Sequence, residues 1–233
     1  AAAGCEPWRS DGSSEGTELL ADLRPGPLGS SPRSVTVSGG RVFFSAEDDE
    51  AGRELWVSDG TAAGTERVVD LAAGLPSSSP SSMVAFAGGV MFVAATAATG
   101  AELWWSDGSG AGTRLVRDIS PGTVGSAPAG LVVVGARVFF AADDGSDGAE
   151  LWVSDGSEAG TRMVADIRPG DLGADPLSLT PVGERVFFSA DDGEHGEELW
   201  ISDGSGAGTR LVRDLAPGEV GSVPLFFAAL DDD

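Results

Sequence analysis

Short apolar segments alternate with turn-forming residues along the whole chain, and no segment has the 3.6-residue period of an amphipathic helix. One stretch shows the pattern clearly, with four segments bounded by Gly, Pro, Asp or Ser at residues 177–182, 185–190, 198–202 and 209–215. Between the last two segments, the run Asp-Gly-Ser-Gly-Ala-Gly supplies glycines for positive φ and an Asp that can bond backbone amides. The pattern predicts four strands joined by tight turns.

This pattern recurs every 48 residues without insertion or deletion, which is typical of a repeat architecture. Three polar or aromatic positions keep the same phase in five copies. They are a Glu (Glu6, Glu54, Glu102, Glu150, Glu198), a Trp (Trp8, Trp56, Trp104, Trp152, Trp200) and the Asp of a Ser-Asp-Gly triplet (Asp11, Asp59, Asp107, Asp155, Asp203). Because the Trp recurs in every third strand, we expect it to pack between neighbouring units.

Four strands in a repeat of about 40–50 residues are typical of a β-propeller blade. We therefore predict an all-β, single-domain, five-bladed propeller over residues 1–233. Its full blades would be residues 26–73, 74–121, 122–169 and 170–217, and residues 218–233 with 1–25 would form the closing blade. The C-terminal piece is short, so the closing blade would have three or four strands. An open array that lacks ring closure is the alternative.

A membrane segment is the other alternative, because residues 71–101 carry no charged side chain. Pro76, Pro80 and a run of Ser interrupt this stretch, and its apolar part is shorter than the ~20 residues of a spanning helix. The stretch also keeps the repeat phase. We therefore predict an apolar blade and no transmembrane segment.

The charge of the chain limits the classes of partner that it can bind. It has 37 acidic and 14 basic residues, with a formal net charge of −23. Nucleic-acid binding rests on basic groups that neutralise phosphates, so this composition argues against it. Anionic membrane surfaces are disfavoured for the same reason.

A single cysteine, Cys5, excludes an intramolecular disulfide. It ends the run Ala-Ala-Ala-Gly-Cys, which resembles the tail of a bacterial lipoprotein signal with Cys5 as the lipidated residue. The charged and apolar parts of such a signal are not in this sequence. Cys5 is therefore either a lipid anchor or an ordinary thiol.

The string Glu-Leu-Trp-x-x-Asp-Gly-Ser/Thr-x-x-Gly-Thr, seen as ELWVSDGTAAGT at residues 54–65, resembles the bacterial ELWxxDGT repeat family over nearly the whole chain. Pro7 departs from that pattern, as do copies with Ser in place of Thr, such as Ser109. The resemblance implies a secreted or surface-exposed repeat protein and gives no catalytic residue. The Ser-Asp-Gly turn is also similar to the Asp-box hairpin of sialidases, a structural turn.

Catalysis has little support in these residues. His195 is the only His, it has no repeat partner, and a Ser-His-Asp arrangement would need its loop to reach a buried Ser. A glycoside hydrolase needs two carboxylates, but carboxylates repeated in every unit are poor candidates for unique catalytic groups. The absence of Tyr removes the sialidase nucleophile. We expect no enzyme and no required cofactor.

The loops between second and third strands carry clustered carboxylates beside glycines, which suit Ca²⁺. The candidate ligands are Asp143, Asp144, Asp147, Asp191 and Asp192. The equivalent loop at residues 95–100 has no carboxylate, so a site would not be needed in every unit. Solvated, mutually repelling loops are the alternative to calcium.

The remaining candidates concern a ligand. Trp105, beside the repeated Trp104, should face the opposite side of its strand, and Arg24 and Arg168 lie in Pro-Gly connectors. These residues suggest a non-enzymatic, lectin-like adhesion module that binds glycans at several blades, outside the cell or on a bacterial surface. A structural module that contacts surface proteins is the alternative, and a glycoside hydrolase is a third interpretation.

Overall fold

The computed structural model describes residues 4–74, 76–225 and 227–228. Every regular element in these residues is a β-strand. The described residues contain no helix long and apolar enough to cross a membrane. The all-β prediction is therefore confirmed. The chain divides into two compact units, Ala1–Leu115 and Val116–Asp233, and each is described by itself.

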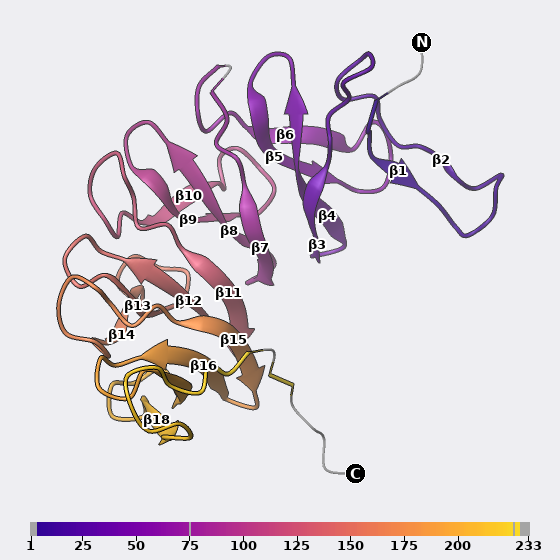
Figure 1. Cartoon of the computed structure of the whole chain (residues 1–233). Helices are drawn as coiled ribbons and strands as arrows, with labels where there is room; N and C mark the ends of the chain where they lie inside the picture. Colours follow the sequence, from indigo (N-terminus) through magenta and orange to yellow (C-terminus); the bar gives the residue numbers. More distant parts are fainter. Residues whose placement is uncertain (1–3, 75, 226, 229–233) are drawn as a thin grey trace. The chain divides into compact units, whose positions relative to one another are not determined.

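The first unit begins with a two-stranded antiparallel sheet and continues with four-stranded sheets whose strands follow chain order (Figure 1). The short sheet consists of β1 (Trp8–Arg9) and β2 (Glu18–Leu19). The next consists of β3 (Arg33–Ser38), β4 (Arg41–Asp48), β5 (Gly52–Ser58) and β6 (Thr65–Val69). The following sheet consists of β7 (Ser81–Phe86), β8 (Gly89–Thr96), β9 (Gly100–Ser106) and β10 (Arg114–Arg117), which crosses the unit boundary.

The second unit has two more four-stranded meanders. One consists of β11 (Ala129–Val134), β12 (Arg137–Asp143), β13 (Ala149–Ser154) and β14 (Arg162–Ala165). The other consists of β15 (Leu177–Val182), β16 (Arg185–Asp191), β17 (Glu197–Ser202) and β18 (Arg210–Arg213). The four strands predicted in residues 177–215 are therefore present, with ends displaced by at most two residues.

The second strand of a sheet reads as a continuous apolar run because it is buried on both faces. Successive side chains of a strand point to opposite faces, so Phe43 and Phe44 of β4 enter different clusters. Phe43 packs with Phe92 of β8, in the neighbouring sheet. Phe44 packs with Trp56, its cross-strand partner, and with Leu23 from the connector after β2. Each middle strand thus joins two layers of core.

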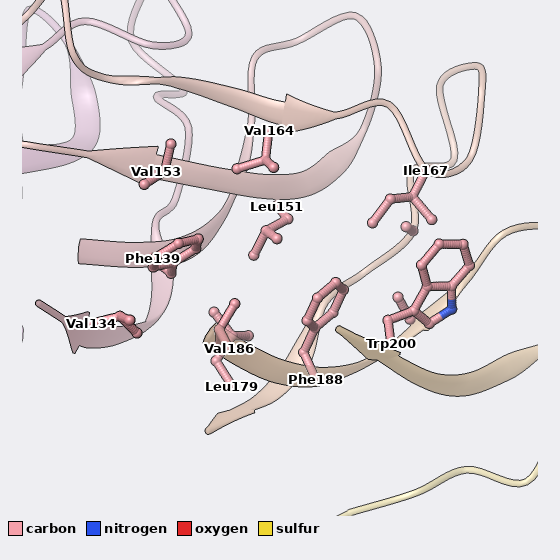
Figure 2. Packing of buried hydrophobic residues seen from close by; sticks show 12 residues of the cluster. Val134, Phe139, Leu151, Val153, Val164, Ile167, Leu179, Val186, Phe188 and Trp200 are labelled. Atoms are coloured by element: carbon pink, nitrogen blue, oxygen red, sulfur yellow. The ribbon is translucent and has the colours of Figure 1, made fainter. Parts of the chain in front are cut away.

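Figure 2 shows how the two sheets of the second unit pack on each other. Phe139 and Leu151 of the first sheet meet Phe188 and Trp200 of the second, and Ile167 from the connector closes the cluster beside Trp200. Phe139, Leu151 and Phe188 are fully buried. Burial of a large apolar side chain contributes roughly 1.5–3 kcal/mol, so this packing is a main source of stability in the unit.

The described residues therefore form sheets of four or two strands stacked through apolar faces, which is consistent with a propeller-like arrangement. The expected closing blade, residues 218–233 with 1–25, falls partly outside the described residues, at 1–3, 226 and 229–233.

Candidate functional site

The Ser-Asp-Gly turn is closed by its own side chains. Asp59 Oδ1 accepts hydrogen bonds from the N–H of Thr61 at 2.8 Å and from its hydroxyl at 2.7 Å. Ser58 Oγ lies 2.7 Å from Thr65 Oγ1. The Thr61 hydroxyl and N–H hold the pKa of Asp59 below its ordinary value. Equivalent bonds are made by Asp11, Asp107, Asp155 and Asp203.

The repeated Glu fixes the connector that follows the fourth strand. Glu198 Oε1 accepts the N–H groups of Ala216 at 2.9 Å and Ser222 at 3.1 Å, and its Oε2 accepts the Ser222 hydroxyl at 2.5 Å. Glu6 and Glu54 bond the equivalent serines in the same way. The described Glu residues of this column are all buried. A sugar hydroxyl therefore has no access to them.

Glu150 differs from the others because its connector offers Ala174 in place of Ser. It accepts N–H groups of Ile167 at 3.0 Å, Arg168 at 3.0 Å and Ala174 at 3.1 Å, without a hydroxyl. Burial raises the pKa of Glu150 to about 7, against the lowering effect of these amides. At Glu198, burial is outweighed by the Ser222 hydroxyl and three amides, which leave the pKa below its ordinary value.

The repeated Trp is a packing residue where its sheet is complete. Trp56, Trp152 and Trp200 are buried. Trp8 is 59% exposed, because β1 has only β2 beside it among the described strands. Trp105, the candidate ligand residue, is half-buried. Its Nε1 donates to the carbonyl of Phe86 at 3.2 Å, and Arg114 lies over its ring at 4.8 Å, so the indole already has partners on its polar edge and its face.

Arg24 and Arg168 hold connectors to the acidic loop of the next sheet in their unit. Arg24 pairs through Nη1 with Glu47 at 2.8 Å and through Nε with Asp49 at 2.7 Å. Arg168 Nη1 pairs with Asp191 Oδ2 at 2.6 Å. Both guanidinium groups are thus engaged in ion pairs rather than presented to a ligand.

The candidate calcium residues organise their own loops. Asp144 Oδ1 accepts the N–H and hydroxyl of Ser146, and Asp143 Oδ1 accepts the N–H of Gly145 at 2.7 Å. Burial and repulsion by Asp144, Asp166 and Asp143 raise the pKa of Asp147. Asp191 and Asp192 make equivalent loop bonds. Within the described residues, no three carboxylate, His or Cys groups are placed to hold one ion, and calcium stays a prediction.

His195 occupies the position that Asp147 has one repeat earlier. Its Nδ1 lies 2.8 Å from Asp192 Oδ2, and hydrogen bonding and charge from Asp192 raise the pKa of His195. The repeat serine of the same sheet, Ser202, is bonded to Thr209 and to the N–H of Gly204. Its hydroxyl is committed to the turn, so these residues do not assemble a Ser-His-Asp triad.

Cys5 is exposed, and its backbone bridges to Gly29. A Cβ on Gly4 would lie 2.4 Å from the backbone nitrogen of Gly29. The close approach of these two backbone segments therefore requires glycine. Gly4 is in repeat phase with Gly52, Gly100, Gly148 and Gly196. Gly4 therefore has an explanation inside the repeat, and lipid attachment at Cys5 stays a prediction.

Sequence reasoning missed a hollow of about 320 Å³ in the second unit, lined largely by alanines of β11, β12 and β13. Ala129, Ala141 and Ala149 lie on its walls, with Asp143 and Asp175 at charged positions. The signal was present in the alignment of repeats, where Ala129 and Ala149 replace Arg33 and Arg53. Loss of two long side chains at neighbouring positions indicates unfilled space.

No protein-family model matches the chain, and no curated protein matches it either. Solved structures do. A puromycin hydrolase has a TM-score of 0.53 and 15% identity over 91% of this chain and 32% of its own. A puromycin-hydrolysing peptidase from Mycobacterium tuberculosis has a TM-score of 0.51 and 15% identity over 80% of this chain and 32% of its own. A protein of Agrobacterium tumefaciens assigned to TolB has a TM-score of 0.50 and 15% identity over 91% and 75%.

At these identities the likeness shows the fold. The chain spans about a third of the length of the hydrolases it matches. The expectation of a lectin-like adhesion module, or of a structural module in a surface assembly, is wrong: the similar structures include peptidases. The geometry also argues against glycan binding at the repeated Glu and Trp residues, because the described Glu column and Trp56, Trp152 and Trp200 are buried.

Proposed function

We propose that this chain is a propeller module that receives peptides for a peptide-bond-hydrolysing enzyme and carries no catalytic groups of its own. One observation supports this most strongly: 91% of the chain matches 32% of a puromycin hydrolase. A similar fraction of a puromycin-hydrolysing peptidase is matched by 80% of the chain. The chain thus corresponds to a part of such enzymes rather than to the whole.

The side chains of the described residues support a non-catalytic role. His195 bonds Asp192, and Ser202, the repeat serine of its sheet, is used inside a turn. The Asp of each Ser-Asp-Gly triplet is held by its own turn. These residues are therefore occupied by structural bonds, and in this proposal catalysis would come from a separate domain or chain.

The test incubates the purified chain with a pool of random-sequence octapeptides and separates the protein by rapid gel filtration. Mass spectrometry then identifies the retained peptides and any fragments. We expect a subset of peptides to be retained intact. Fragments would show an intrinsic peptidase, and absence of any retained peptide at millimolar concentration would contradict peptide reception.

We also propose that the sheets are blades of a five-bladed ring, in which residues 218–233 complete the sheet begun by β1 and β2. The exposed Trp8 supports this, because in complete sheets Trp56, Trp152 and Trp200 are buried and Trp104 is half-buried. Membership of the ELWxxDGT repeat family rests on the repeated motif alone. Small-angle X-ray scattering tests closure: a compact chain of this length has a radius of gyration of about 17 Å, and a clearly larger value would indicate an open array.

A further inference from the structure

The hollow in the second unit lies at repeat positions that carry long side chains in the β3–β6 sheet of the first unit. Ala149 of β13 and Ala129 of β11 replace arginines found 96 residues earlier. The hollow continues past Asp175 and Leu177, which also line a second hollow of about 340 Å³. Leu177 is 52% exposed, so it forms an accessible apolar rim.

The first unit shows what fills the equivalent place. There, Arg53 Nη1 donates to the carbonyl oxygens of Ser31 at 3.0 Å and Ser45 at 3.3 Å. Arg53 Nη2 donates to Glu47 Oε1 at 3.1 Å. Its guanidinium is mostly buried, with 12% of the side chain exposed. The β3–β6 sheet therefore contains a guanidinium site built from two carbonyls and one carboxylate.

The second unit retains the backbone of that site. Asp175 N–H donates to the carbonyl of Ala149 at 3.0 Å, as Ser79 N–H donates to that of Arg53 at 3.1 Å. Likewise, Asp143 N–H donates to the carbonyl of Ser126 at 3.0 Å, as Glu47 N–H, two repeats earlier, donates to that of Ser30 at 2.8 Å.

The three acceptors also have counterparts at the same repeat positions. The carbonyls of Ala127 and Ala141 correspond to those of Ser31 and Ser45, and the carboxylate of Asp143 corresponds to that of Glu47. All three residues line the hollow. The acceptors are thus kept while the guanidinium that used them is missing.

We propose that this hollow binds the arginine side chain of a peptide, with the guanidinium in the place that Arg53 takes in the first unit. This rests on the proposed function, since it names the substrate class as arginine-containing peptides. Asp143 and Asp175 supply negative charge, and Leu177 contacts the residue beside the arginine. A planar guanidinium has five N–H donors in a fixed fork, so it matches several acceptors better than an ammonium group does.

The experiment titrates fluorescein-labelled Ala-Arg-Ala-amide into the chain and follows anisotropy, with the citrulline and lysine versions as matched probes. Citrulline keeps the shape and removes the charge. We expect the citrulline peptide to bind at least about tenfold more weakly, since hydrogen bonds to charged groups are stronger than neutral ones, with the lysine peptide in between.

Ala149→Arg should fill the hollow from within and abolish binding, because the first unit accommodates Arg at this position. Ala159→Arg, in an exposed turn, makes the same change in charge and should bind as the wild type does. Equal affinity for arginine and citrulline peptides, unchanged binding by Ala149→Arg, or no binding of the arginine peptide would each overturn the inference. The octapeptide retention experiment is read out separately. If the chain retains octapeptides but does not prefer the arginine peptide in the anisotropy titration, the arginine inference fails and the proposed function stands.

Discussion

Arg137 Nη1 donates to the carbonyl oxygen of Asp203 at 2.7 Å, across 66 residues of chain. The guanidinium also lies over the ring of Phe139, 5.3 Å from its centroid. A Cβ on Gly204 would come within 2.5 Å of Arg137 Nη1. Arg41 repeats the contact in the first unit, where it donates to the carbonyl of Asp107. The Ser-Asp-Gly turn is therefore an anchor for the preceding sheet as well as a hairpin.

Arg137→Ala should lower the free energy of unfolding by about 1 kcal/mol, because it removes a hydrogen bond from a charged donor at a partly exposed site. Urea denaturation followed by tryptophan fluorescence measures the effect. Arg185→Ala is the matched control, since Arg185 has the same repeat position and is exposed in the last sheet. An equal loss for both variants would show that charge, rather than the contact with Asp203, is responsible.

Gly160→Ala should cost at least about 2 kcal/mol, because the new Cβ would lie 2.0 Å from Asp155 Oδ1 and displace the carboxylate that closes the turn. Gly206→Ala is the control in the next turn. Its Cβ would meet only the carbonyl of Val164 at 3.4 Å, and Ala62 already occupies the equivalent position. Thermal unfolding of both variants distinguishes this turn-specific clash from a general preference for glycine.

The raised pKa of Glu150 makes stability depend on pH. The folded state holds the proton up to about pH 7, whereas an unfolded Glu releases it near pH 4.3. Stability should therefore fall by about 4 kcal/mol as the pH rises between these values and stay level above them. Ala174→Ser supplies the hydroxyl that Ser222 gives to Glu198, and should reduce the fall. Denaturation at several pH values measures the free energy of unfolding as a function of pH. If Glu150→Gln shows the same fall with pH, groups other than Glu150 cause it.

His195 is the only histidine, so its titration can be followed by proton NMR without assignment. We expect a pKa above the ordinary value of about 6.5, because Asp192 bonds its ring and Asp214 and Glu194 add negative charge. Since the folded pKa is raised, this stabilisation is complete below pH ~6.5 and is lost as the pH rises through the folded value. Asp192→Asn should lower the pKa, and an unchanged value would show that the ring faces solvent.

The strands could be predicted from the sequence because apolar runs, glycine turns and a 48-residue phase all agree. The first strands contain a feature that the sequence hides. Ser34, Ser82 and Ser178 have φ of 53°, 50° and 54° at a break in register. Gly130 takes the same place in the remaining sheet. Serine is not a signal for the left-handed region, so the bulge there was not foreseen.

The site was predicted less well, because repeated residues suggest function and structure equally. Glu198 and its equivalents recur in every unit, and at Glu198 the partners are amides and a serine 17 to 24 residues later. The Ser found at that spacing in four of the five copies was a signal for this bond. At Ala149 the informative feature was the difference from Arg53 two repeats earlier, and only the contacts of Arg53 show what that difference leaves open.

Retention of peptides by the purified chain tests the central claim most directly. We would add an octapeptide pool and an oligosaccharide pool side by side, recover the protein by gel filtration, and identify bound molecules by mass spectrometry. We expect intact peptides, enriched in arginine, and no oligosaccharide. Retained oligosaccharide without peptide, or cleavage of the peptides by the chain alone, would contradict a non-catalytic peptide-receiving propeller module.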